Sequence, residues 1–129
     1  MSREAIATER APAAVGPYSQ ACRRSGGRTL YLSGQIPLDP DSGQLVAGPP
    51  AEQAERCMRN LQAVLAAAGL GLDDVVRCTI YLTDLGAFGA VNEVYGRFFG
   101  EPPPARACVQ VAALPKGAQV EIDAIAERG

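Results

Sequence analysis

The segment AEQAERCMRNLQAVLAAAGLGLDDVVRCTIYLT, residues 51–83, decides the fold because it predicts a helix followed directly by a strand. Apolar residues recur every three or four positions over residues 51–68, the spacing of one helix face, and Gly69 follows as a stop signal. Residues 75–83 alternate instead, which indicates a strand with one apolar face. Together they predict a helix packed on one face of a sheet. The apolar positions are Ala54, Cys57, Met58, Leu61, Val64, Leu65 and Ala68 in the helix and Val76, Cys78, Ile80 and Leu82 in the strand.

A second helix and further strands extend this unit in both directions. Thr83 and Asp84 form a helix-start signal, and Gly100 with the prolines after it ends the helix. Further strands are predicted at residues 5–8, 19–24, 28–33 and 119–126, and from residue 106. The second helix carries one stripe, in which the amide of Asn92 is expected to be buried: Phe88, Val91, Asn92, Tyr95, Phe98 and Phe99. Residues 1–129 are therefore expected to form a single α+β domain, with one sheet and both helices on one of its faces.

The strands also carry side chains on the face away from the helices. Successive residues of a strand point to opposite faces, so a shift of one residue would exchange the two sets. Aromatic and aliphatic groups on the second face require cover, and another copy of the chain is the simplest cover. The alternation therefore predicts a homo-oligomer with polar residues near its subunit boundaries. The residues expected on the second face are Tyr31, Ser33, Tyr81, Arg106, Cys108, Glu121 and Ile125.

Composition excludes several classes of function. A net charge of −2 provides no general attraction to nucleic acid. The chain has no apolar run of roughly 18 residues and no recognisable secretory signal, so neither a membrane partner nor secretion is expected. The four cysteines form no C-x-x-C pair, which fits a reducing compartment such as the cytoplasm. Because histidine is absent, a Ser-His-Asp triad and a histidine-bearing zinc site are excluded, and acid–base chemistry must come from carboxylates, tyrosine, cysteine or water.

Two charged residues lie within otherwise apolar strands near the C-terminus. Arg106 interrupts the segment PARACV, residues 104–109, and Glu121 lies in VEIDAIA, residues 120–126. A fixed guanidinium binds a small carboxylate through two parallel hydrogen bonds, and a carboxylate in a partly dry pocket is a candidate general base. The two residues indicate a site that holds a small organic acid and activates water. A structural Arg–Glu ion pair is the alternative interpretation.

Four more residues are candidate members of this site, and each has a structural alternative. Tyr18 is either a satisfied core aromatic or a pocket residue at a strand entrance. Ser33 either faces the pocket or forms the turn that ends its strand. Asn92 either binds a ligand or caps a backbone group. Cys108 has no histidine to activate it, so a structural or backbone role fits better than a nucleophile.

Seven segments of the chain together resemble one known family, the reactive intermediate (imine) deaminases, also called the RidA or YjgF-like family. The resemblance covers essentially the whole chain, in order and with matching spacing. Single segments are weak signals, whereas seven in register are specific. The segments are APAAVGPYSQ (11–20), LSGQIP (32–37), VN (91–92), FF (98–99), PARACV (104–109), ALPK (113–116) and VEIDAIA (120–126).

The resemblance implies a chorismate-mutase-like α+β fold and a homotrimer whose sheets form a central barrel, with active sites in clefts between subunits. It also implies hydrolysis of small 2-enamine and 2-imino acids, namely 2-iminobutanoate and 2-iminopropanoate, to 2-keto acids and ammonia. No metal or cofactor is implied, because a protonated imine is already electrophilic and the enzyme mainly orients it beside a water molecule.

The resemblance further implies a role for each candidate residue. Arg106 is the carboxylate clamp, and Glu121 positions or activates the attacking water. The backbone at Gly34 and Cys108 can hydrogen-bond the substrate. The remaining pocket residues orient substrate or water, or in the case of Phe88 form a wall for the alkyl group: Tyr18, Ser33, Phe88 and Asn92.

Two alternative functions remain open. A related enzyme would use the same pocket on another enamine acid, such as 2-aminoacrylate. A non-catalytic trimer would sense a metabolite or act as a chaperone-like module, and that role would not require Arg106. The acidic balance and the absence of histidine argue against a ribonuclease.

Overall fold

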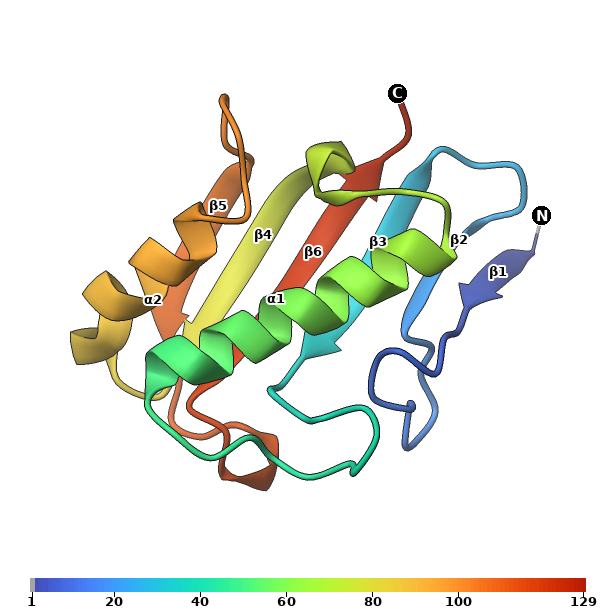
Figure 1. Cartoon of the computed structure of the whole chain (residues 1–129). Helices are drawn as coiled ribbons and strands as arrows, with labels where there is room; N and C mark the ends of the chain where they lie inside the picture. The colour runs from blue at the N-terminus through green and yellow to red at the C-terminus, as the bar shows by residue number, and fades with distance from the viewer. Residues whose placement is uncertain (1) are drawn as a thin grey trace.

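Six strands form one mixed sheet in the computed structural model, which describes residues 2–129 (Figure 1). Their order across the sheet is β1-β2-β3-β6-β4-β5, so the last strand in sequence, β6, lies between β3 and β4. Neighbouring strands are antiparallel except for β4 and β5, which run parallel. The strands are β1 (Arg3–Ile6), β2 (Ala21–Arg24), β3 (Thr29–Gln35), β4 (Val75–Leu82), β5 (Ala105–Gln110) and β6 (Val120–Glu127).

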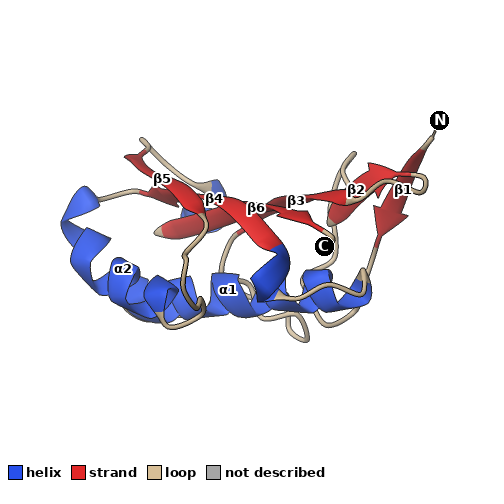
Figure 2. Ribbon diagram, turned by 90° about the horizontal axis from the view of Figure 1, so that it is seen from above, coloured by secondary structure: helices blue, strands red, loops and turns tan. Residues whose placement is uncertain are grey.

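Both helices cover the same face of this sheet, and the other face carries no element of the described chain (Figure 2). Helix α1 (Pro50–Ala67) begins with a proline in its first turn, where a missing N–H costs nothing, and is followed by Gly69 in a left-handed conformation, φ +77°. Helix α2 (Phe88–Gly96) lies beside α1 and connects β4 to its parallel neighbour β5. The predicted α+β fold with both helices on one face is confirmed. No helix within residues 2–129 combines the length and apolar character needed to cross a membrane.

The core lies between α1, α2 and the sheet. The stripe predicted for the first helix is buried from Ala54 to Leu65, and it packs against alternate residues of the central strands. Tyr31 on the opposite face of the sheet is 53% exposed. The alternation predicted for β3 and β6 is therefore confirmed. The core residues of the central strands are Leu30, Leu32, Cys78, Ile80, Leu82, Val120, Ile122, Ala124 and Ala126.

We expect Leu65→Ala to lower the free energy of unfolding by about 3 kcal/mol, because it removes a fully buried side chain from the middle of this core and leaves a cavity. Denaturant unfolding measures the effect. Gln62→Ala, on the exposed side of the same helix, is the control and should change stability by less than about 0.5 kcal/mol. Equal losses in the two variants would contradict the core assignment.

Two predicted strand details are wrong, and each has a local cause. Val76 was expected in the core, but a register shift between Val75 and Arg77 places Val75 there and leaves Val76 49% exposed. The N-terminal strand was expected at residues 5–8 and instead spans Arg3–Ile6. Thr8 is held by the side chain of Gln20, since Thr8 N donates to Gln20 Oε1 at 2.7 Å and Gln20 Nε2 donates to Thr8 O at 3.0 Å.

The predicted stripe of the second helix is confirmed only in part: Val91 and Tyr95 are buried and Phe98 and Phe99 pack against the core, but Asn92 and Phe88 were wrongly placed in it. The buried residues of α2 are Val91, Val94 and Tyr95, whereas Asn92 is exposed. The cause is that α2 begins only at Phe88, after a short 3-10 turn over Leu85–Ala87. A helix this short buries a narrow stripe centred on Val91 and Tyr95, and Asn92 lies on its flank with Phe88 one turn before it.

The face predicted for β5 is wrong as well. Arg106 and Cys108 were expected on the open face of the sheet, but the parallel register places them beside Cys78 and Ile80, which are both buried under the helices. Cys108 packs against the helix-side core, whereas Val109 is 43% exposed on the other face. Arg106 therefore extends from the edge of the sheet towards α2.

Candidate functional site

The guanidinium of Arg106 lies against three side chains of α2. Its Nη1 donates a hydrogen bond to Asn92 Oδ1 at 2.5 Å. Its central carbon lies 5.4 Å from the ring centroid of Phe88 and 5.1 Å from that of Tyr95. These contacts fix the plane of a side chain that is otherwise exposed. Because a guanidinium has five N–H donors, it keeps donors for a second ligand, and a carboxylate matches their geometry.

Cys108 follows Arg106 by two residues on the same face of β5. Its side chain is partly buried against the core. Burial raises the pKa of the Cys108 thiol above its ordinary value of 9.0, and the nearby Arg106 charge only partly opposes this. The thiol is therefore protonated at neutral pH and is a poor nucleophile, so the Cys108 backbone is the part suited to contact a ligand.

Glu121 lies on the opposite, open face of the sheet. Its cross-strand neighbour is Tyr81, and Asp123 is two residues further along β6. The pKa of Glu121 is raised from its ordinary 4.5, first by partial burial and then by the negative charge of Asp123. Asp123 itself accepts hydrogen bonds from Thr79 N at 3.1 Å and from Tyr81 Oη at 3.0 Å. A partly exposed carboxylate with a raised pKa has the properties of a general base.

Gly34 gives the Glu121 side chain its space. β3 and β6 change register between Leu32 and Gln35, and Gly34 lies in this irregular stretch. A Cβ atom at Gly34 would overlap Glu121 Oε2 and lie 3.0 Å from its Cδ. The glycine is therefore required for the position of the carboxylate rather than for an unusual backbone angle.

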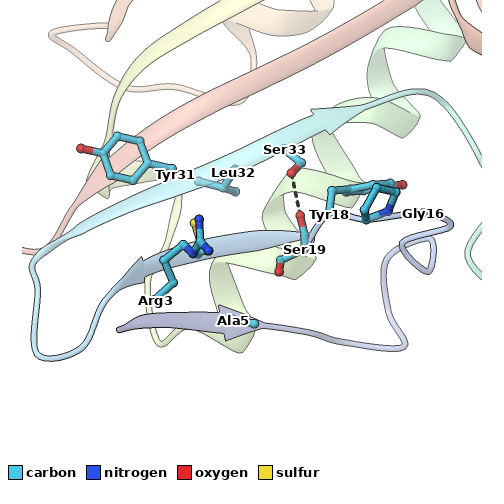
Figure 3. Close-up of a pocket in the computed structure, with 10 residues that line it drawn as sticks. Arg3, Ala5, Gly16, Tyr18, Ser19, Tyr31, Leu32 and Ser33 are labelled. Atoms are coloured by element: carbon cyan, nitrogen blue, oxygen red, sulfur yellow. Dashed lines mark hydrogen bonds between the residues drawn. The ribbon is translucent and has the colours of Figure 1, made fainter. Parts of the chain in front are cut away.

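Tyr18 and Ser33 lie together at one end of a surface pocket of about 800 Å³ (Figure 3). Ser33 Oγ donates a hydrogen bond to Ser19 O at 2.6 Å, and Ser33 N donates to Gln20 O at 3.0 Å. Tyr18 is 50% exposed, and its hydroxyl accepts a weak hydrogen bond from Val15 N at 3.4 Å. Both side chains can therefore still accept or donate a hydrogen bond to a ligand. The other lining residues are Arg3, Ala5, Gly16, Pro17, Ser19, Cys22, Tyr31 and Leu32.

Within one chain, the candidate residues therefore lie in two separate groups. The first group lies at the β5 edge beside α2: Phe88, Asn92, Arg106 and Cys108. The second group lies on or beside the open face: Tyr18, Ser33, Gly34 and Glu121. Two strand-to-strand steps and three residues along the strand separate Arg106 from Glu121, which places their Cα atoms roughly 14 Å apart. A structural ion pair between these two residues is therefore absent from the described chain.

Three further residues contact or support these groups and were not singled out for the site by the sequence. Tyr95 contacts Arg106, and its spacing of seven from Phe88 and three from Asn92 was the available signal. Asp123 lies beside Glu121. Gln20 is buried and donates further hydrogen bonds to Ala11 O at 3.3 Å and Pro12 O at 2.7 Å, which anchors the loop leading to Tyr18. Within residues 2–129, no three His, Cys, Asp or Glu side chains gather closely enough to hold a metal ion.

We expect Gly34→Ala to lower by about tenfold or more the turnover of a reaction in which Glu121 takes a proton from water, while the chain still folds. The added methyl group displaces the flexible end of Glu121 rather than any backbone, and small displacements of a reacting group are costly. Steady-state kinetics and a thermal melt measure the two effects. The control is Gly96→Ala, which adds the same methyl group in open space. Unchanged turnover in Gly34→Ala would separate the Glu121 position from catalysis.

Comparison with known proteins gives a consistent set of similarities. A family model described as Endoribonuclease L-PSP matches residues 8–128. Protein DfrA of Myxococcus xanthus is 62% identical over 126 residues, covering 98% of this chain and 96% of the relative. The 2-iminobutanoate/2-iminopropanoate deaminase of Mus musculus is 52% identical over 127 residues, covering 98% and 93%. The crystal structure of E. coli TdcF with bound serine aligns with a TM-score of 0.91 at 43% identity, covering 98% and 99%.

Proposed function

Because the chain belongs to the YjgF/RidA family, whose model is described as Endoribonuclease L-PSP, we propose that it hydrolyses small 2-imino acids to 2-keto acids and ammonia. The proposed substrates are 2-iminobutanoate and 2-iminopropanoate, which appear in the name of the mouse relative. The observation that carries the proposal is the oriented guanidinium of Arg106, held by Asn92 and two aromatic rings at an exposed edge. The serine bound to E. coli TdcF supports it, since serine has the carboxylate and C2 nitrogen of a 2-imino acid.

The proposed reaction needs few groups. Arg106 binds the substrate carboxylate through two hydrogen bonds, and Phe88 contacts the alkyl group. A water molecule attacks C2 of the protonated imine while Glu121 accepts a proton from that water. The proton held by Glu121 then passes to the amine nitrogen of the resulting carbinolamine, the C–N bond breaks, and the departing ammonia takes the C2 hydroxyl proton as the C2 oxygen becomes a carbonyl. One iminium acid and one water thus give one 2-keto acid and one ammonium ion.

We further propose that the site is completed between copies of the chain, in a homotrimer. Arg106 and Glu121 lie on opposite faces of one sheet, so a single chain does not bring both to one small substrate. The uncovered face exposes Tyr31 and Val109, which favour contact with another copy. In this arrangement the Arg106 group of one subunit faces the Glu121 group of its neighbour.

Imine hydrolysis tests the function directly. A threonine dehydratase generates 2-iminobutanoate in the presence of semicarbazide, which traps any imine that is not hydrolysed. We expect this protein to suppress semicarbazone formation and to accelerate 2-oxobutanoate release. If the folded oligomer does not suppress semicarbazone formation, 2-iminobutanoate is excluded as a substrate. The same assay with serine in place of threonine would then test hydrolysis of the imine that forms from 2-aminoacrylate.

Subunit complementation tests the shared site. Arg106→Ala and Glu121→Gln are each expected to be nearly inactive. When the two variants are unfolded together and refolded in equal amounts, about one quarter of the sites receive an intact Arg106 from one subunit and an intact Glu121 from the next. Recovery of about that fraction of wild-type activity supports the shared site, whereas a mixture no more active than its components places both residues in one chain's site.

A further inference from the structure

Tyr95 is the buried residue in contact with the proposed carboxylate clamp. Only 4% of Tyr95 is exposed, and its ring lies between the core and the Arg106 guanidinium, whose central carbon is 5.1 Å from the ring centroid. The ring also packs against Phe99, with centroids 4.9 Å apart. The Tyr95 ring is therefore fixed by packing, whereas the guanidinium that it contacts is exposed.

We propose that Tyr95 is a positioning residue that holds the Arg106 guanidinium in the orientation required to bind a carboxylate; this rests on the proposed function. Phe88 also contacts the guanidinium, but it is 37% exposed and lies in the first turn of α2, so it is a weaker support than the buried Tyr95. Asn92 fixes one nitrogen of the guanidinium, and the Tyr95 ring fixes its plane. The two contacts together define one direction for the remaining N–H donors.

The hydroxyl of Tyr95 takes no part in this role. Its oxygen is buried and makes no hydrogen bond of good geometry with residues 2–129, and the polar group beside it is the Cys78 thiol. A buried hydroxyl whose neighbour is a weakly hydrogen-bonding thiol contributes little to the stability of the fold. The aromatic ring should therefore be sufficient for positioning, which separates Tyr95→Phe from substitutions that remove the ring.

The test compares Tyr95→Leu with Tyr95→Phe and with Phe99→Leu in the full-length protein. Phe99→Leu is the matched control because Phe99 packs on Tyr95 and makes no ring contact with Arg106. The first readout is the NMR order parameter of the Arg106 Nε–Hε bond without ligand. We expect it to fall only in Tyr95→Leu, since only that variant removes the ring beneath the guanidinium. The second is calorimetric affinity for the stable keto acid 2-oxobutanoate, which should fall about tenfold in Tyr95→Leu alone.

Two further results separate the possible failures. In an Arg106→Met background, Tyr95→Leu should have no additional effect on 2-oxobutanoate affinity, because the residue acts through the arginine. An order parameter that is the same in wild type and Tyr95→Leu, or an equal loss of affinity in Phe99→Leu, would overturn the positioning role. An imine assay that fails while the order parameter still depends on Tyr95 would instead overturn the proposed substrate and retain the positioning role.

Discussion

Arg106→Ala should lower kcat/KM for 2-iminobutanoate by at least about 100-fold, equivalent to about 3 kcal/mol of transition-state stabilisation. The variant removes both hydrogen bonds to the substrate carboxylate and leaves Asn92, Phe88 and Tyr95 without the group they orient. Competition between the protein and semicarbazide for the imine measures the ratio. The fold should be retained, because Arg106 is exposed and forms no salt bridge within residues 2–129.

Two further arginine variants test whether the loss of activity is specific to the Arg106 guanidinium. Arg106→Lys should remain within a few-fold of Arg106→Ala, because an ammonium group cannot provide two parallel hydrogen bonds or the planar contact with the rings. Arg97→Ala is the matched control, since Arg97 directly follows α2, is exposed, and pairs with Glu93 at 2.9 Å. Activity of either Arg106 variant near that of the control would exclude Arg106 as the clamp.

Glu121→Gln should lower turnover by about 100-fold or more while the affinity for 2-oxobutanoate changes little, because the amide cannot accept the proton of the attacking water. Turnover of the wild type should rise with pH through the Glu121 pKa, which partial burial and Asp123 place above the ordinary 4.5. That acidic limb should be lost in the variant. Glu127→Gln, at the exposed end of the same strand, is the control.

As pH rises through the Glu121 pKa, the contribution of Glu121 to the free energy of unfolding should fall, whereas turnover should rise. A raised pKa means that the folded chain binds the Glu121 proton more tightly than the unfolded chain does. The contribution of Glu121 to the free energy of unfolding is therefore fully present below the unfolded pKa and is lost as pH rises through the higher folded pKa. At neutral pH, Glu121→Gln should be at least as stable as the wild type. A variant that is both inactive and markedly destabilised would indicate a structural role.

The parts of the fold that could be predicted from sequence are those with a strong and regular pattern. Helix α1 has five turns, and its boundaries differ from the prediction by one residue at each end. β3 and the first half of β6 alternate large apolar residues with polar or aromatic ones, which fixes the two faces of each strand. The open face on which Glu121 lies followed directly from that alternation.

The face of β5 could not be predicted, because this strand lacks such a regular pattern. The segment ARACV alternates alanine with arginine and cysteine, and alanine is equally tolerated on a buried and an exposed face. The Arg106 side chain is long enough to leave the helix side of an edge strand and reach solvent. The face of the sheet on which Arg106 lies is set by the parallel register of β5 with β4, and that register depends on the path of α2 between the two strands. The contacts of Asn92 and Tyr95 with Arg106 depend on that same path.

The position of Arg106 and Glu121 on opposite faces of one sheet subjects the proposed enzyme to mass action. In the shared site proposed above, an isolated chain would hold only half of each site, so specific activity should fall when the protein is diluted below the dissociation constant of its assembly. Near that concentration, the proposed rate of imine removal should rise more steeply than the amount of protein. A cell that makes slightly more of the chain would then gain a disproportionate increase in capacity.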